Sequence, residues 1–183
     1  DERKLLIETN ERAAEWFQRA LSSDGAAAAR QVIQKRQVSA AAVEKFKLGY
    51  APQSGLLAAL RPPDPVSTGL FLKNDRGDVY DRFRHRLIFP IWNERGRVIG
   101  FGGRALGDAE PKYLNSPETS VYLKSSVLYA LHFARESAQR VGKLVVVEGY
   151  FDCLSLHQQG IDNVVASCGT ALTAQQVALM ARY

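Results

Sequence analysis

The sequence lacks the cysteine pattern of a zinc ribbon or of a disulfide scaffold. Its 183 residues include two cysteines, Cys153 and Cys168, which stand fifteen positions apart. Zinc ribbons use paired Cys-x-x-Cys ligands, and disulfide frameworks use several spaced cysteines. Both are therefore excluded within this chain. No histidine partner is suggested near either thiol, so we expect both cysteines to be small core residues rather than nucleophiles.

Long apolar runs are also missing. No stretch approaches the ~20 residues that cross a bilayer, and the first residues have no signal-peptide character. With 46% hydrophobic and 23% charged residues, the composition is that of a folded globular protein. We predict a cytoplasmic protein without membrane association. Because the chain begins and ends within predicted helices, we also expect it to be a piece of a longer protein.

Acidic residues are scarce in one segment. The chain has 24 basic and 19 acidic side chains, a net charge of +5. Residues 82–104 hold six arginines and one acid, Glu94. A local cluster of this kind indicates a polyanionic partner more strongly than the overall charge does.

The hydrophobic pattern changes its period along the first two thirds of the chain. Residues 4–60 have mainly helical spacing, with Ser39 as a helix N-cap. An antiparallel meander follows, with glycine-containing turns at Asn74–Gly77 and Asn93–Gly96. Its expected strands are residues 69–73, 79–80, 86–92 and 97–101. A loop over residues 107–119 and a helix over 126–140 complete this part.

The last part has the pattern of a βαβα unit. Residues 144–147 are wholly apolar, which favours a parallel strand buried on both faces. A helix, a second strand and a final helix are expected over residues 151–160, over 163–166 and from the cap Thr173 onward. We place a domain boundary near Gly142, between an N-terminal lobe of residues 1–141 and a second unit of residues 142–183.

Two strand ends in this unit carry polar residues. Glu148 directly follows the first strand, and Asp152 lies four positions later. The carboxyl ends of parallel strands form the functional edge of an open α/β sheet, where a carboxylate can hold Mg²⁺ or relay a proton. Alternatively, both acids only stabilise the following helix through its dipole. The second strand end, Ser167–Thr170, reads as an ordinary strand-to-helix turn.

The arginine-rich segment has a regular alternation. In a strand, Arg82, Arg84 and Arg86 would share one face, and their guanidiniums would bind successive phosphates. The alternative is a solvated sheet edge protected by charge. With no acid inside the segment, anion binding is favoured. Phe101–Arg104 reads as a flexible turn before an arginine, and Lys112–Pro117 as a loop in which Tyr113 stacks on a base.

These segments together resemble the RNA-polymerase core of bacterial DnaG-type primases. The matching stretches, in order, are Lys35-Arg36, Tyr80–Ile91, Arg95–Arg104, Pro111–Thr119, Lys124 and Val146–Asp152. The resemblance implies an α+β fold: a mixed α/β N-terminal lobe with an antiparallel meander, followed by the first βαβα part of a Toprim fold, which is Rossmann-like. It implies a DNA-directed RNA polymerase, a nucleotidyltransferase that makes short RNA primers on single-stranded DNA.

The resemblance also implies residue roles. Arg36, Arg104 and Lys112 would bind the incoming nucleoside triphosphate. The groove for template and primer would be formed by Arg82, Arg84, Tyr113 and Lys124. Glu148 would be the catalytic Toprim glutamate and a ligand of Mg²⁺ or Mn²⁺. Asp152 would be a further metal ligand or only support its loop.

Several implied parts lie outside this chain. The Toprim pattern places an Asp-x-Asp pair on the next strand. The resemblance to primases also implies a zinc site upstream and a domain that binds the replicative helicase downstream. The partners implied for the whole enzyme are the single-stranded DNA template, the RNA primer and ribonucleoside triphosphates. We predict that the chain alone has an incomplete metal site, binds single-stranded nucleic acid weakly, and is inactive. Two alternatives stay open: a non-catalytic single-stranded nucleic-acid-binding module, and another Toprim enzyme such as a nuclease or topoisomerase.

Overall fold

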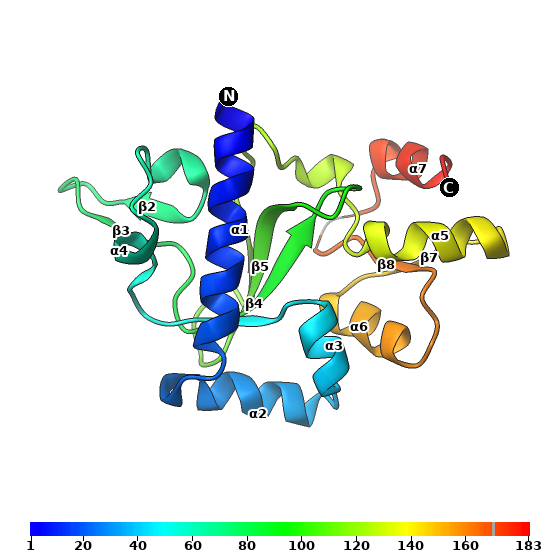
Figure 1. Cartoon of the computed structure of the whole chain (residues 1–183), viewed down its shortest axis with the longest axis horizontal. Helices are drawn as coiled ribbons and strands as arrows, with labels where there is room; N and C mark the ends of the chain where they lie inside the picture. Colours follow the sequence, from blue (N-terminus) through cyan, green and yellow to red (C-terminus); the bar gives the residue numbers. More distant parts are fainter. Residues whose placement is uncertain (170) are drawn as a thin grey trace.

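The computed structural model describes residues 1–169 and 171–183, so Thr170 of the second strand-end turn lies outside the described residues. Helices and strands are mixed, and the predicted α+β class is confirmed (Figure 1). The helices are α1 (Glu2–Ala20), α2 (Ala27–Lys35), α3 (Ala40–Lys45), α4 (Leu56–Leu60), α5 (Leu131–Val141), α6 (Tyr150–Gln158) and α7 (Ala174–Met180), with 3-10 turns η1 (Asp24–Ala26), η2 (Val66–Thr68) and η3 (Lys124–Ser126). None of these helices is long and apolar enough to span a membrane.

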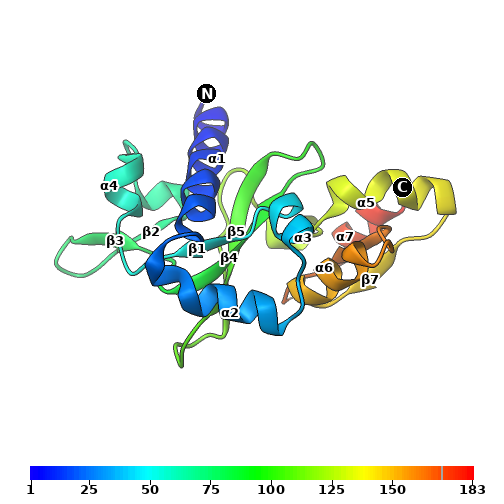
Figure 2. The ribbon, with the colours of Figure 1, turned by 60° about the horizontal axis from the view of Figure 1, so that its bottom comes forward.

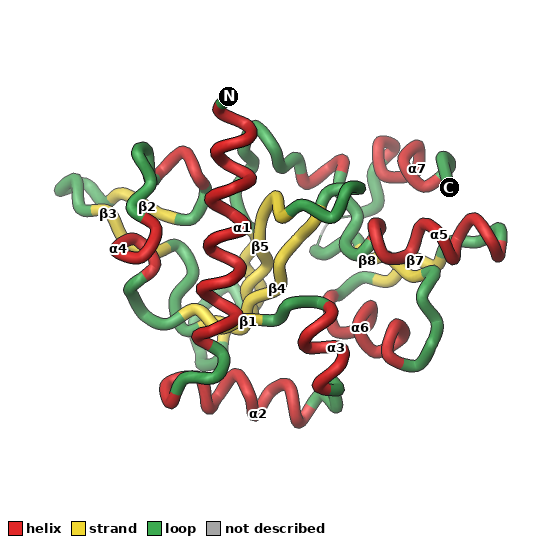
Figure 3. Tube along the Cα trace, in the orientation of Figure 1, coloured by secondary structure: helices red, strands yellow, loops and turns green. Residues whose placement is uncertain are grey.

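The centre of the molecule is a four-stranded antiparallel sheet of order β1-β4-β5-β6. Its strands are β1 (Gly49–Ala51), β4 (Arg86–Trp92), β5 (Val98–Ala105) and β6 (Tyr113–Asn115). Helix α1 lies across this sheet (Figures 1 and 3). The crossing is close because Gly49 has no side chain: a Cβ there would lie 2.7 Å from the Phe17 Cβ.

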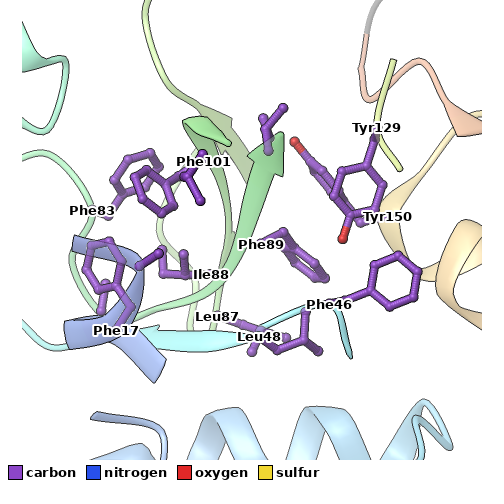
Figure 4. Packing of buried hydrophobic residues seen from close by; sticks show 14 of the residues in the cluster. Phe17, Phe46, Leu48, Phe83, Leu87, Ile88, Phe89, Phe101, Tyr129 and Tyr150 are labelled. Atoms are coloured by element: carbon purple, nitrogen blue, oxygen red, sulfur yellow. The ribbon is translucent and has the colours of Figure 1, made fainter. Parts of the chain in front are cut away.

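One hydrophobic core runs from α1 to the C-terminal part of the chain. Figure 4 shows Phe17 near Ile88 at one side of this core and Phe89 with Tyr150 at the other. The Phe89 and Tyr150 rings stack with centroids 4.6 Å apart, and Tyr129 packs edge-on against Tyr150 at 4.8 Å. Because Tyr150 belongs to α6, this stacking joins the central sheet to the last third of the chain.

Both predicted hairpin turns are confirmed. Gly77 and Gly96 have positive φ angles of 85° and 76°, and the Oδ1 atoms of Asn74 and Asn93 accept backbone hydrogen bonds inside each turn. The prediction of a single meander is wrong, because the hairpins belong to two sheets. Among the described strands, β2 (Phe71–Lys73) and β3 (Val79–Asp81) pair only with each other, whereas β4 and β5 are in the central sheet.

Several predicted boundaries are corrected by long-range pairing. Strand β1 was not predicted, and β6 lies inside the expected loop of residues 107–119. Phe101–Arg104 is not a flexible turn but part of β5. Gly102 is needed there because a Cβ would overlap the Tyr150 hydroxyl. Helix α5 begins at Leu131 rather than 126, after Ala130 with its positive φ of 69°.

The predicted arginine strand at residues 82–86 is wrong. The backbone leaves the strand conformation after Asp81, and His85 has a positive φ of 48°, so the alternation of a strand is lost. Arg86 begins β4 and is buried, where its Nη1 donates to the carbonyls of Gly103 and Lys112. The three guanidiniums therefore do not form a row on one strand face.

The C-terminal part has the predicted parallel pair, β7 (Val145–Val147) with β8 (Val164–Ala166). The prediction that the first strand is buried on both faces is wrong, since Val145 and Val146 are 39% and 37% exposed. Strand β8 is the buried one, packed against α5 and α6 (Figure 1). Figure 2 shows α5, α6, α7 and β7 together at one end of the molecule. Thr173 caps α7 as predicted, in a capping box with Gln176.

The two cysteines differ. Cys153 is fully buried in the core as predicted, and burial raises the pKa of its thiol to about 12. Cys168 is only partly exposed and has a φ of +54° in the turn after β8. Burial also raises the pKa of the Cys168 thiol, so neither group has the thiolate character of a nucleophile.

Candidate functional site

The turn between β7 and α6 carries the two predicted carboxylates. Glu148 is exposed directly after β7, and Asp152 is exposed in the first turn of α6. The strand end is fixed by the neighbouring turn after β8, because the Cys168 amide donates to the Glu148 carbonyl at 3.0 Å. Gly149 has an extended backbone with a φ of −117°, and a Cβ there would lie at an ordinary contact distance of 3.4 Å from Asp152 Oδ2, so the turn itself does not require a glycine.

A cavity of about 390 Å³ opens at this edge of the β7–β8 pair. It is lined by Arg36, Tyr113, Asn115, Glu148, Gly149, Tyr150, Phe151, Asp152, Cys168 and Gly169. The cavity thus brings together four predicted site residues from distant parts of the chain: one cation, one aromatic ring and two carboxylates. We call it the acidic-edge cavity.

Arg104 lies next to the same cavity through Phe151. The guanidinium carbon of Arg36 is 4.8 Å from the centre of the Phe151 ring, and that of Arg104 is 6.0 Å from it. Arg104 also pairs with Tyr113 across β5 and β6. The predicted triphosphate-binding arginines therefore share one aromatic neighbour, which the sequence analysis did not single out.

Asn115 of β6 connects the two parts of the molecule. Its Oδ1 accepts a 2.6 Å hydrogen bond from the Tyr150 hydroxyl, and its Nδ2 donates to the Cys168 carbonyl at 3.0 Å. Its own carbonyl accepts a 2.8 Å bond from Arg82 Nη2. Since Tyr150 and Cys168 both adjoin the Glu148 strand end, Asn115 holds that end against the arginine-bearing lobe.

A second cavity, of about 480 Å³, contains the remaining predicted arginines. Its lining includes Arg82, Arg84, His85, Arg86 and the loop of residues 107–111, and we call it the basic cavity. Burial lowers the pKa of Arg82, and burial together with the charges of Arg82 and Arg84 lowers that of Arg86. Within the described residues, none of the three lies within 4 Å of a carboxylate.

The arginines of the basic cavity are chemically suited to an anion, and Asp108 and Glu110 of the neighbouring loop line the same cavity without forming an ion pair with them. Arg84 lies over the Tyr80 ring, 5.1 Å from its centre, and its side chain is exposed. A 2.9 Å hydrogen bond joins His85 Nδ1 to the Tyr50 hydroxyl. Guanidiniums in a partly enclosed space bind phosphate more strongly than solvated ones.

The two predicted lysines are placed differently. Lys124 opens η3 and borders a small recess with Ser167 and Cys168 beside the β8 end. Lys112 precedes β6 with an exposed side chain, and its carbonyl accepts bonds from Ala105 and Arg86. Lys112 lines neither the acidic-edge cavity nor the basic cavity.

The donor set for a divalent cation is partial. In the part of the chain that the structure describes, no group of three or more His, Cys, Asp or Glu side chains is arranged to hold a metal. Glu148 and Asp152 offer the hard oxygen donors that Mg²⁺ and Mn²⁺ prefer, but Mg²⁺ requires more ligands than two side chains supply. These two residues fit one side of such a site, not a complete one.

Comparison with known proteins shows the family to which the chain belongs. A family model described as the DNA primase catalytic core, N-terminal domain, matches residues 16–135. The chain belongs to the DNA primase catalytic core family. A Toprim domain model matches residues 142–183 of this primase chain.

Individual relatives are also DNA primases. The chain is 44% identical over 186 residues to the DNA primase of Clostridium acetobutylicum, covering 97% of this chain and 30% of that protein. It is 40% identical over 188 residues to the DNA primase of Escherichia coli K12, covering 99% and 32%. The chain thus spans about a third of the curated relatives it matches.

Solved primase structures share the fold. The DnaG primase catalytic domain bound to ssDNA superimposes with a TM-score of 0.89 at 40% identity, covering 98% of this chain and 60% of that one. The RNA polymerase domain of Mycobacterium tuberculosis primase DnaG, in complex with a double-stranded DNA oligomer with a 6-nucleotide overhang, gives 0.92 at 39% identity, covering 98% and 59%. The predicted family and fold are confirmed.

Proposed function

We propose that this primase chain holds the template strand and the incoming ribonucleotide during DNA-templated synthesis of RNA primers. The observation that carries the proposal is the acidic-edge cavity, where Arg36, Glu148 and Asp152 meet. The nucleic-acid complexes of the related DnaG structures support the template part of the proposal. We also propose that a domain boundary near Gly142 separates the N-terminal lobe from the Toprim unit.

The triphosphate would lie against the cationic side of the acidic-edge cavity. In primer synthesis, a 3′-hydroxyl attacks the α-phosphate of a ribonucleotide and pyrophosphate leaves. Arg36 and Arg104 would bind the phosphate oxygens through their N–H groups and offset the charge that develops there. Lys112, exposed beside β6, would add a more distant positive charge.

The template and primer would follow the basic cavity and the neighbouring loop. Arg82 and Arg84 would bind backbone phosphates, and Lys124 would do so near the β8 end. Tyr113 is 39% exposed and lines the acidic-edge cavity, so its ring is available to stack on a base. The stacked base would then be held close to the triphosphate.

Glu148 would act as the catalytic carboxylate, with Asp152 beside it as a second ligand or as a support for the turn. A bound Mg²⁺ or Mn²⁺ would activate the attacking oxygen and neutralise the leaving pyrophosphate. Since the described residues provide a partial donor set, we propose that the 183-residue chain binds its ligands but does not polymerise. The wider proposal includes a bacterial cytoplasmic location and a helicase partner for the whole primase.

The experiment is a pair of measurements on the purified chain. We expect fluorescence anisotropy to show salt-dependent binding of a single-stranded oligodeoxynucleotide. The arginines of the basic cavity would displace cations condensed on the DNA phosphates, so added salt would weaken the binding. We expect no RNA product with ribonucleotides, template and Mg²⁺. Primer formation would contradict the proposed inactivity, and absence of single-strand binding even at low salt would contradict the proposed template site.

A further inference from the structure

Phe151 brings together two side chains of like charge. The guanidinium carbons of Arg36 and Arg104 lie 4.8 Å and 6.0 Å from its ring centre. Neither arginine forms an ion pair with a carboxylate in the described ranges. An aromatic face attracts cations through its quadrupole, so the ring supplies the favourable interaction that an acid would otherwise provide.

The ring itself is held firmly. Phe151 is 6% exposed in the first turn of α6, and its ring packs edge-on against Phe89 at 5.3 Å. Phe89 in turn stacks on Tyr150. Because these rings belong to the continuous core, the Phe151 ring has little freedom to move with the arginines.

Helix α6 also forms hydrogen bonds with the segment that directly follows Arg36. At its C-terminal end, Gln158 Oε1 accepts from the Ser39 amide at 3.0 Å, and Gln158 Nε2 donates to the Gln37 carbonyl at 2.8 Å. These bonds fix the turn between α2 and α3 on α6. The hydrogen bonds of Gln158 therefore hold the backbone next to Arg36, and the Phe151 ring holds its guanidinium.

A ring and a carboxylate would have different consequences for an anion. A carboxylate would accept the guanidinium N–H groups and cancel much of their charge, whereas a ring face leaves the positive charge and the in-plane donors available. Holding two long arginine side chains in place before an anion arrives also reduces the entropy lost on binding.

We propose that Phe151 is a positioning residue that holds Arg36 and Arg104 at the acidic-edge cavity, where both bind one polyphosphate. The inference deepens the proposed function and rests on it. Phe151 lines the same cavity, but its neutral ring offers no donor to a phosphate, so its effect acts through the two arginines and is measured as affinity for the anion.

The test uses inorganic tripolyphosphate without metal, because this probe has neither a base nor a divalent ion. Isothermal titration calorimetry compares the chain with its F151L and F151Y variants. We expect F151L to bind about 5-fold more weakly, the combined effect of losing two exposed cation–π contacts. We expect F151Y to bind like the original chain because it keeps the ring.

Phe133 offers a matched control. The Lys45 Nζ lies 4.8 Å from its ring centre, away from the acidic-edge cavity. F133L removes a cation–π contact of the same length, and we expect tripolyphosphate affinity to stay unchanged. As a second readout, NMR of the arginine Nε–Hε groups should show ring-current shifts at Arg36 and Arg104 that disappear in F151L and persist in F151Y.

The outcomes separate the two claims. If the original chain does not bind tripolyphosphate, the proposed triphosphate site fails. If it binds, and R36A and R104A both weaken binding while F151L does not, the positioning role of Phe151 fails and the proposed site stands. Should F151L not fold, F151M fills the same core space without a ring and takes its place in both measurements.

Discussion

The N-terminal lobe and the C-terminal unit differ in how completely their sheets are buried. All seven residues of β4 are buried in the four-stranded sheet beneath α1. In the C-terminal unit, β7 has one hydrogen-bonded neighbour among the described strands, and Val145 and Val146 are more than a third exposed. The unit therefore buries less sheet of its own, and it packs on the lobe through Tyr150, which stacks on Phe89 and donates to Asn115.

The two regions also divide the chemistry. The lobe supplies the arginines of both cavities, and the unit supplies Glu148 and Asp152. Neither region contains the acidic-edge cavity alone, since Arg36 and Tyr113 come from one and the carboxylates from the other. The geometry of the acidic-edge cavity therefore depends on how the two regions pack on each other.

The largest effect is expected where the two regions touch most closely. G102A adds a methyl group that overlaps the Tyr150 hydroxyl, so β5 and α6 must move apart. We expect a loss of about 3 kcal/mol in the free energy of unfolding, measured with urea. G25A is the control, because no atom lies within 4 Å of the added Cβ. Equal stability of the two variants would show that the regions are not tightly joined at Gly102.

A smaller effect is expected from the hydrogen bonds of the same contact. N115D keeps the acceptor for Tyr150 but replaces the donor to the Cys168 carbonyl with a repelling oxygen. We expect a loss of about 2 kcal/mol, since a buried acceptor is left unpaired. N163D breaks a bond of the same 3.0 Å length, to the Lys143 carbonyl on the exposed surface, and should cost about 0.5 kcal/mol. A larger loss for N163D than for N115D would contradict this account.

A test of the lobe alone concerns its basic cavity. The double variant R82A/R84A should bind single-stranded DNA more weakly, and the slope of log affinity against log salt should fall by about 0.7 for each lost phosphate contact. R95A, an exposed arginine on the β4–β5 turn, is the control and should leave the slope unchanged. An unchanged slope in the double variant would mean that its arginines contact no phosphate.

The smallest effect is expected from pH. Burial, with the positive charges of Arg135 and Lys45, lowers the pKa of His132 to about 4 from 6.5. The unfolded chain therefore binds a proton more readily, so the stability from neutral His132 is complete above pH 6.5 and is lost as pH falls toward 4. H132Q should reduce the pH dependence of the free energy of unfolding, measured with urea, between pH 4 and 6.5. H85Q removes a different histidine and serves for comparison. The same pH slope in H132Q as in the original chain would contradict the assignment.

Local patterns in the sequence were sufficient for the helices, the turns and the parallel strands. Ser39, Asn74 and Thr173 were correctly identified because capping and turn hydrogen bonds join residues close in sequence. Strands β1 and β6 could not be found this way. Each has three residues, and each forms only by pairing with a distant strand.

Four of the residues singled out from the sequence line one cavity in the structure, but the geometry of that cavity had no signal in the sequence. Glu148 could be found from its position at a strand end, but its neighbour Arg36 came from the family resemblance. The alternation of arginines over residues 82–86 wrongly predicted a strand, because nothing in the sequence reveals the left-handed backbone of His85. The roles of Phe151 and Asn115 depend on tertiary contacts and had no local signal.

The most direct test of the shared cavity is the effect of Glu148 on anion binding. If its carboxylate borders the same space as Arg36 and Arg104, E148Q removes a repulsion and should tighten metal-free tripolyphosphate binding about 3-fold at low salt. E136Q removes an exposed charge on α5 and should not change the affinity. Unchanged or weaker binding by E148Q would place the carboxylate away from the arginines and contradict the account.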